Sequence, residues 1–268
     1  MINPLNILET TLGSYPSLLG IFVSSLILRT TILVVLLKRK PPSSVKAPWF
    51  FLNVVLASVI VADSAWIFKL LQILFFPKLD YRFLLFWIRI AWGFTAIQYQ
   101  GLSLFLESII CKEKLFGIRQ KTFTLISCSF LLYFVILAFV NFNTIAGAGR
   151  PYSEMIMQKI ETVYVLLPLM LSTFFIVSRR LYSKNLPKIL SKQLKILFAA
   201  VIIPVWISDL WQVFPLGMAS NWITNSYASV GFSTILLTYA LYYCARRMVG
   251  LRFLNFQSHV QANAKFNF

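Results

Sequence analysis

The most restrictive feature of the sequence is a 28-residue stretch, Phe83 to Ile110, which is mostly apolar and yet contains charged residues. It is long enough to cross a bilayer as a tilted helix. Its polar residues include Arg89, Gln98, Gln100, Ser103 and Glu107. A charge at membrane depth is costly, so such residues normally face other helices or a cavity. The stretch therefore predicts a surrounding bundle that supplies partners for Arg89 and Glu107.

Helical periodicity gathers several of these residues on one narrow stripe. At about 100° per residue, Gln100 lies about 20° from Arg89 around the helix axis, and Glu107 lies at about 0°. The small residues Gly93 and Ala96 fall on the same side, and the opposite face is Leu, Phe and Ile. We therefore expect the stripe to face the interior of the bundle.

Composition indicates an all-α integral membrane protein. Hydrophobic residues make up 59% of the chain and charged residues 12%, about half the charged share of an average soluble domain. A net charge of +17 would suggest nucleic acid for a soluble protein, but here we attribute it to membrane topology and expect no nucleic-acid partner. Phosphate-loop, HExxH, CxxC and EF-hand patterns are absent from the sequence, so we expect no metal and no cofactor.

The pattern of apolar runs predicts a bundle of seven transmembrane helices. Residues 1–16 form a short external head, 17–245 the transmembrane domain, and 246–268 a cytoplasmic juxtamembrane tail. The expected spans are 17–37, 48–76, 83–110, 123–142, 160–178, 196–214 and 222–244.

The distribution of Lys and Arg predicts the orientation. Eighteen of the 25 basic residues fall in the loops on one side, four fall on the other side, and three lie inside spans. Basic residues in short loops face the cytoplasm. We therefore expect the N-terminus outside and the C-terminus in the cytoplasm. Because the chain also lacks N-x-S/T sequons and cysteines on the outer side, we place it in the bacterial inner (plasma) membrane.

Depth within the spans predicts which charges meet. Arg29 and Asp63 lie near the middle of adjacent helices, whereas Arg89 and Asp209 lie about two turns from the outer end of theirs. We therefore expect the pairs Arg29–Asp63 and Arg89–Asp209, and we interpret Glu107 as a polar anchor near the inner end. Such pairs can simply fix helix packing, or they can line a polar cavity that binds a ligand or switches between two states.

The span at 196–214 favours the cavity. Pro204 bends a helix by removing a backbone hydrogen bond, and Trp206, Asp209 and Trp211 follow it. Our candidate set for ligand binding or switching is Arg89, Gln100, Trp206, Asp209 and Trp211. Beyond the last span, Arg246, Arg247 and Arg252 belong to a short amphipathic stretch that would carry a signal out of the bundle.

Seven spans with an external N-terminus invite comparison with G-protein-coupled receptors. Glu107, Ser108 and Ile109 stand where those receptors have D-R-Y, however, and the span at 222–244 has neither N-P-x-x-Y nor the lysine of a microbial rhodopsin. With its short loops and its exit RRMVGLRFLNFQSHV (246–260), the chain resembles the seven-span N-terminal sensor region of bacterial membrane histidine kinases. The resemblance implies a kinase core beyond residue 268.

We expect a receptor or sensor module that detects a small ligand or a membrane state and passes a helix rearrangement to a cytoplasmic signalling partner, a histidine kinase. The alternatives are a small-solute or proton-coupled transporter that uses the midplane charges, and a free-standing receptor like a G-protein-coupled receptor. An enzyme is not expected, because no catalytic constellation stands at membrane depth. Expected partners are the lipid bilayer and an unknown small ligand, and a homodimer is among the oligomeric states that the sequence allows.

Overall fold

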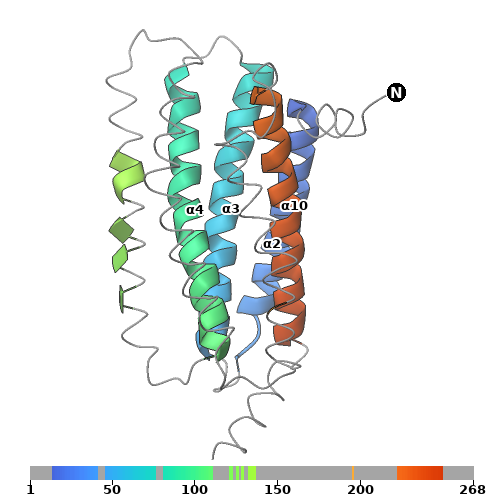
Figure 1. Cartoon of the computed structure of the whole chain (residues 1–268). Coiled ribbons are helices and arrows are strands. Elements are labelled where there is room, and N and C mark those ends of the chain that lie inside the picture. The colour runs from blue at the N-terminus through green and yellow to red at the C-terminus, as the bar shows by residue number, and fades with distance from the viewer. Residues whose placement is uncertain are drawn as a thin grey trace, which may run out of the picture.

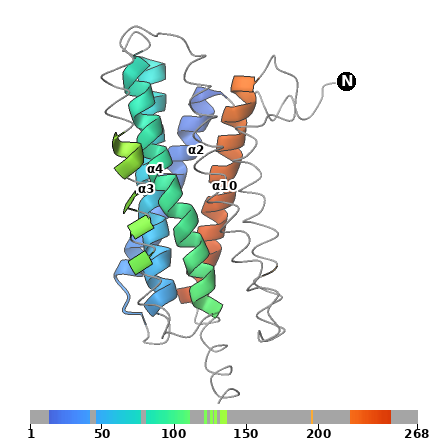
Figure 2. The ribbon, with the colours of Figure 1, turned by 60° about the vertical axis from the view of Figure 1, so that its left-hand side comes forward.

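The computed structural model describes residues 14–41, 46–76, 81–110, 195 and 222–249, with short pieces between 121 and 136. Regular structure in these ranges is helical. The long helices are α2 (Tyr15–Leu37), α3 (Lys46–Phe75), α4 (Tyr81–Ile110) and α10 (Trp222–Val249). They stand side by side as a bundle with nearly aligned axes (Figures 1 and 2). The expected all-α fold is confirmed for these residues, whereas the spans at 160–178 and 196–214 and most of 123–142 lie outside them.

Helix α3 is the central element of the described bundle. It packs against α2 on one side and α4 on the other, and α10 lies mainly against α2. The sequence suggests that 83–110 is the helix around which the bundle forms. Among the described helices, α3 holds the position between α2 and α4, and it buries residues all along its length, from Ala47 to Gln72.

Contacts between the helices define their directions. Phe22 stacks on Trp66 while Arg29 meets Asp63, so α2 and α3 are antiparallel. Leu18 and Phe22 cluster with Val230, whereas Arg29 bonds to Thr234 further along α10, so α2 and α10 run in the same direction. Gly101 lies beside Val55 while Trp87 stacks on Phe68, so α3 and α4 are antiparallel as well. The last residues of α2, α4 and α10 therefore share one end of the bundle with the first residues of α3. Exposed basic residues occupy this end: Lys38, Arg39, Lys40, Lys46 and Arg246.

The helices begin and end a few residues from the expected bounds. α2 starts at Tyr15, so the head is shorter than 1–16: Ser14 caps the helix by accepting the Ser17 N–H at 3.4 Å, and Pro16 lies in the first turn, where no N–H is needed. α3 starts at Lys46, before Pro48 rather than at it, for the same reason. It ends at Phe75, one residue before the expected 76, and α4 starts at Tyr81 instead of 83.

Helix α10 is longer than the expected span at 222–244. It continues to Val249, so the first residues of the proposed tail, from Arg246 on, are helical. The sequence YYCARRMV (242–249) contains neither Gly nor Pro, and nothing in it stops a helix. The basic end of α10 is therefore rigidly joined to its buried part.

Two of the described helices, α2 and α3, are long and apolar enough to cross a membrane. Many large apolar side chains of α2 are exposed in the structure, including Val23, Ile27, Leu28, Val34 and Val35. A helix that is apolar on its exposed face as well as on its buried face suits a lipid surrounding better than water.

Candidate functional site

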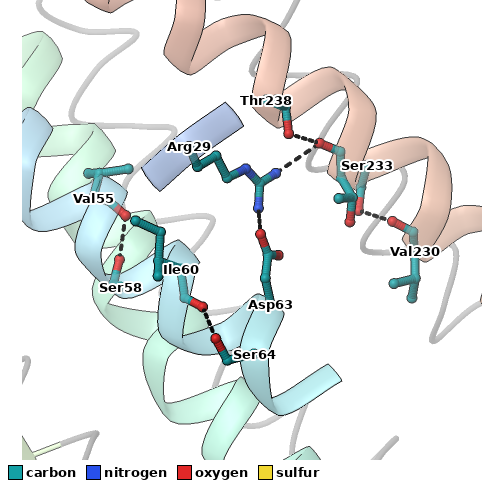
Figure 3. Close-up of polar contacts among 10 residues, drawn as sticks. Arg29, Val55, Ser58, Ile60, Asp63, Ser64, Val230, Ser233 and Thr238 are labelled. Carbon is teal, nitrogen blue, oxygen red and sulfur yellow. Dashed lines mark hydrogen bonds and ion pairs between the residues drawn. The ribbon is translucent and has the colours of Figure 1, made fainter. Parts of the chain in front are cut away.

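The candidate site centres on Arg29, in the middle of α2. Its side chain is only 1% exposed, although it is the most polar side chain of the helix. Arg29 Nη1 donates to Asp63 Oδ2 of α3 at 2.5 Å, and Nη2 donates to the main-chain carbonyl of Thr234 in α10 at 2.8 Å. Figure 3 shows the guanidinium group between the two helices. One side chain thus connects three helices through charge-assisted hydrogen bonds.

Asp63 forms an ion pair with Arg29 and is 3% exposed. Nearby hydroxyl residues of α3 bond within their own helix instead. Ser58 donates to Val55 O at 2.8 Å and Ser64 donates to Ile60 O at 2.8 Å (Figure 3). The charge of Asp63 is therefore balanced by Arg29, which is what a buried carboxylate requires.

The α10 side of the site is a hydroxyl-rich turn. Thr238 Oγ1 donates to Thr234 O at 2.7 Å, so this carbonyl accepts from both Thr238 and Arg29. Ser233 Oγ donates to Val230 O at 3.1 Å. All three hydroxyl residues of this turn are buried. Because a carbonyl oxygen has two lone pairs in addition to its dipole, the Thr234 carbonyl can hold the guanidinium without any acidic residue on α10.

A cavity of about 60 Å³ lies beside the ion pair. All four long helices contribute to its wall: Phe22, Arg29, Val59, Ala62, Asp63, Trp66, Trp92, Thr95, Gln98, Val230, Ser233, Thr234 and Leu237. Its volume exceeds the 10–15 Å³ or so that one water molecule needs. The wall thus combines an ion pair, an amide and hydroxyl groups with apolar side chains, as in a binding site for a small polar molecule.

Two donors in this wall make no hydrogen bond among the described residues. They are Arg29 Nε and Trp92 Nε1, both on buried side chains. A buried N–H without a partner costs about 1–3 kcal/mol relative to a satisfied one. Arg29 of α2 and Trp92 of α4 line the same cavity, so an acceptor inside it lies beside two side chains that each carry an unsatisfied N–H among the described residues.

The wall also limits what chemistry the site supports. Its charged residues are Arg29 and Asp63, whose charges cancel. Groups of three or more His, Cys, Asp or Glu that could hold a metal ion do not occur among the described residues. The arrangement can hold a small molecule, exchange hydrogen-bond partners, or keep three helices in a fixed relation.

The structure brings Arg29 and Asp63 together but uses a different face of α4 from the expected one. Arg89 and Gln100 are buried, with exposures of 1% and 9%, yet the cavity is lined by Trp92, Thr95 and Gln98. Gln98 lies about 180° around the helix from Arg89. The stripe that carries Arg89 and Gln100 is buried, as expected, but it does not line this cavity. Helix α4 is also buried on its other side, at Gln98, and Ile88, Trp92 and Ala96 cluster with Phe134.

Several predicted residues lie beyond what the structure describes. Trp206, Asp209 and Trp211 fall outside the described residues, and with them the proposed partner of Arg89. Glu107 lies in α4, but its side chain is not described. Arg246 is exposed at the end of α10, the side chain of Arg247 is not described, and Arg252 lies outside the described ranges.

Sequence reasoning misses the α10 and α4 residues of the wall. The spacing of Thr234 and Thr238 at i and i+4 in an otherwise apolar helix is a signal for a polar face that the sequence does contain. Gln98 stands out as a polar residue, but its polarity alone does not place it. The sequence contains no signal for the Thr234 carbonyl as an acceptor, because every residue has a main-chain carbonyl.

Neither a protein-family model, nor a curated protein, nor a solved structure matches this chain.

Proposed function

We propose that the chain is a multi-pass integral membrane protein of the bacterial plasma membrane, with seven spans, an external N-terminus and a cytoplasmic C-terminus, and that it acts as a receptor or sensor module. The observation that carries the proposal is the link from Asp63 through Arg29 to the Thr234 carbonyl. It joins the buried centre of the bundle to the main chain of the helix that leads to Arg246.

The physical basis is that a buried ion pair has few intermediate states. Separating the two charges in a low dielectric is strongly unfavourable, so the pair is either formed or replaced by another set of partners. A stimulus that changes the partners of Arg29 therefore releases or shifts α10 as a unit. Such two-state packing is what a sensor needs, provided that the stimulus favours one of the two arrangements.

Helix α10 is suited to transmit such a shift. It is continuous from Trp222 to Val249, so a displacement at Thr234 reaches Arg246 without passing a loop. The receiving partner in this proposal is a cytoplasmic histidine kinase, either joined to this chain or separate. Reading the gene past the codon for Phe268 distinguishes a fused kinase core from a free-standing receptor.

The direct test measures the distance between the ends of α2 and α10. Spin labels are attached to Leu37→Cys and Arg246→Cys, both exposed and at the same end of the bundle, after Cys111, Cys128 and Cys244 are replaced. The double change Arg29→Met/Asp63→Leu removes the link without leaving a lone buried charge. We expect the distance distribution to shift by about 2 Å or to broaden.

The matched control is Thr31→Val. Thr31 is on α2 near Arg29, but it is exposed and bonds within its own helix, to Ile27 O at 2.8 Å. This variant should leave the distance distribution unchanged. If removal of the Arg29–Asp63 pair also leaves the distribution unchanged, α10 is not controlled by the pair and the sensor proposal fails.

A second candidate function is proton-coupled or small-solute transport. The position of Asp63 in the wall of a polar cavity supports it, because transporters place ionisable residues at such sites. Purified protein in vesicles with a pH-sensitive dye separates the two functions. A proton flux that is lost in Asp63→Asn supports transport, whereas no flux together with a distance change supports the sensor.

A further inference from the structure

Arg29 Nε and Trp92 Nε1, which make no hydrogen bond to any residue that the structure describes, carry an inference that does not depend on the sensor proposal. Both side chains are more than nine-tenths buried, and both line the cavity of about 60 Å³. They come from α2 and α4, on different sides of the bundle. An occupant of the cavity therefore lies between side chains from two helices that carry unsatisfied N–H donors, and it satisfies them by presenting hydrogen-bond acceptors.

Hydrogen-bond acceptors are also present in the cavity wall. Thr95 Oγ1 donates to Ala91 O at 2.9 Å and Ser233 Oγ to Val230 O. With their protons used in this way, the two hydroxyl oxygens keep lone pairs that can accept. Gln98 adds an amide, which offers both kinds of group. The occupant that fits best both accepts and donates hydrogen bonds.

The charges of the wall residues further limit which molecules can occupy the cavity. Among the described wall residues, Arg29 and Asp63 are the charged ones and they neutralise each other. An anion would compete with Asp63 for the guanidinium and leave an uncompensated negative charge, and a cation would leave a positive one. An uncharged occupant causes neither problem.

We infer that the cavity is a binding site for a small uncharged molecule that both accepts and donates hydrogen bonds, held between Arg29 Nε and Trp92 Nε1. Water and a primary amide of about four non-hydrogen atoms share this chemistry and suit the volume. This binding site differs from the ion pair, which connects the helices through Arg29 Nη1 and Nη2. The binding site uses Arg29 Nε, the edge of the guanidinium group that neither Asp63 nor Thr234 occupies.

The test uses the full chain in lipid nanodiscs and acetamide as the probe. A molecule of this size binds weakly, so it is supplied at about 100 mM, and acetate at the same concentration is the charged molecule of equal size. We expect acetamide to raise the unfolding temperature by about 2 °C and acetate to produce no such rise. A larger rise with acetate would overturn the inference, since the site would then select anions.

Trp92→Phe keeps most of the ring but removes the donor, and it should abolish the response to acetamide. Trp87→Phe is the matched control: Trp87 is on the same helix, stacks on Phe68 with a centroid distance of 4.8 Å, and does not line the cavity. It should respond like the unchanged protein. Gln98→Leu provides a second cavity variant, expected to lose the response, should Trp92→Phe fail to fold.

Water as the occupant is distinguished by nuclear magnetic resonance on tryptophan-labelled protein. If water fills the site too tightly for acetamide to displace it, acetamide causes no shift, but the indole proton that disappears in Trp92→Phe shows magnetisation transfer from bound water. This result supports the inference with water as the occupant. The absence of both an acetamide response and a water contact at Trp92 would overturn it.

Discussion

The two sides of α3 are held by different kinds of contact. Toward α4, the contact depends on shape: Gly101 lies so close to α3 that an added Cβ would come within 2.6 Å of Val55 Cγ2, and Phe68 stacks on Trp87. Toward α2 and α10, the contact depends on directed polar bonds from Arg29, with a cavity beside them. Close packing leaves no room for a second arrangement, whereas polar bonds can exchange partners.

This difference suggests where the bundle can move. The α3–α4 contact has the properties of a rigid unit, in which any displacement must overcome steric overlap. The α2–α3–α10 contact is the one at which a change of hydrogen-bond partners could shift one helix. Each of the following predictions tests one side of this comparison.

The largest effect is expected at the ion pair. Arg29→Met leaves Asp63 buried and unpaired, and Asp63→Leu does the same to Arg29, so each should lower the free energy of unfolding by about 3–5 kcal/mol. The double variant should lose much less than the sum, since it buries no lone charge. Unfolding titrations in mixed micelles measure all three, and additive losses would show that the residues are not coupled.

At the close contact between α3 and α4, Gly101→Ala should destabilise the protein by about 1–2 kcal/mol, because the overlap with Val55 outweighs the better helix propensity of Ala. Adding Val55→Ala should restore part of the loss by making room. Gly20→Ala is the control: nothing lies within 4 Å of the position that its added methyl group would take, so the same change should be neutral or slightly stabilising. Equal effects at the two glycines would refute the shape-based contact.

The aromatic stacks allow a finer comparison. Phe68–Trp87 joins α3 to α4 with a centroid distance of 4.8 Å, and Phe22–Trp66 joins α2 to α3 with a centroid distance of 5.7 Å. Double-mutant cycles with Leu should give coupling energies of about 1 kcal/mol for the first pair and less for the second. A stronger coupling for Phe22–Trp66 would contradict the view that the α3–α4 side is the more tightly packed one.

The smallest effect is expected for a single hydroxyl. Thr238→Val removes the buried bond to Thr234 O within α10, at 2.7 Å, and should cost about 0.5 kcal/mol, at the low end of the net contribution of an intramolecular hydrogen bond. Thr31→Val removes a bond of the same kind at an exposed position and should cost less. The difference between the two variants in one unfolding assay reports the contribution of the polar network on α10.

The sequence predicts the four described long helices to within a few residues, because runs of apolar residues broken by basic or Pro-containing loops leave few alternatives. It also suggests the meeting of Arg29 with Asp63, since two opposite charges at equal depth on neighbouring helices have little choice of partner. Helix ends are less predictable. In the sequence, Pro16 and Pro48 suggest that a helix begins after or at the proline. In the structure each helix begins before its proline, because the first helical turn accepts proline.

The face of α4 that lines the cavity is beyond prediction for a physical reason. Arg89, Gln98 and Gln100 are all buried, so polarity marks both sides of the helix and does not tell which side faces α2 and α10. Likewise, the acceptor on α10 is a main-chain carbonyl, and the position of α3 between α2 and α4 follows from packing rather than from any residue pattern. Such features depend on how helices meet, which periodicity alone does not determine.

We propose that α2 and α10, which run in the same direction, both cross a membrane and that their basic ends lie together on the cytoplasmic side. Single cysteines at Arg39, Arg246 and Phe76, all exposed positions, are placed in a variant without other cysteines and treated in intact cells with an impermeant thiol reagent. We predict that positions 39 and 246 react only after the cells are permeabilised, while position 76, at the other end of the bundle, reacts in intact cells. Labelling of 39 and 246 from opposite sides, or recovery of the chain in the soluble fraction, would contradict the account.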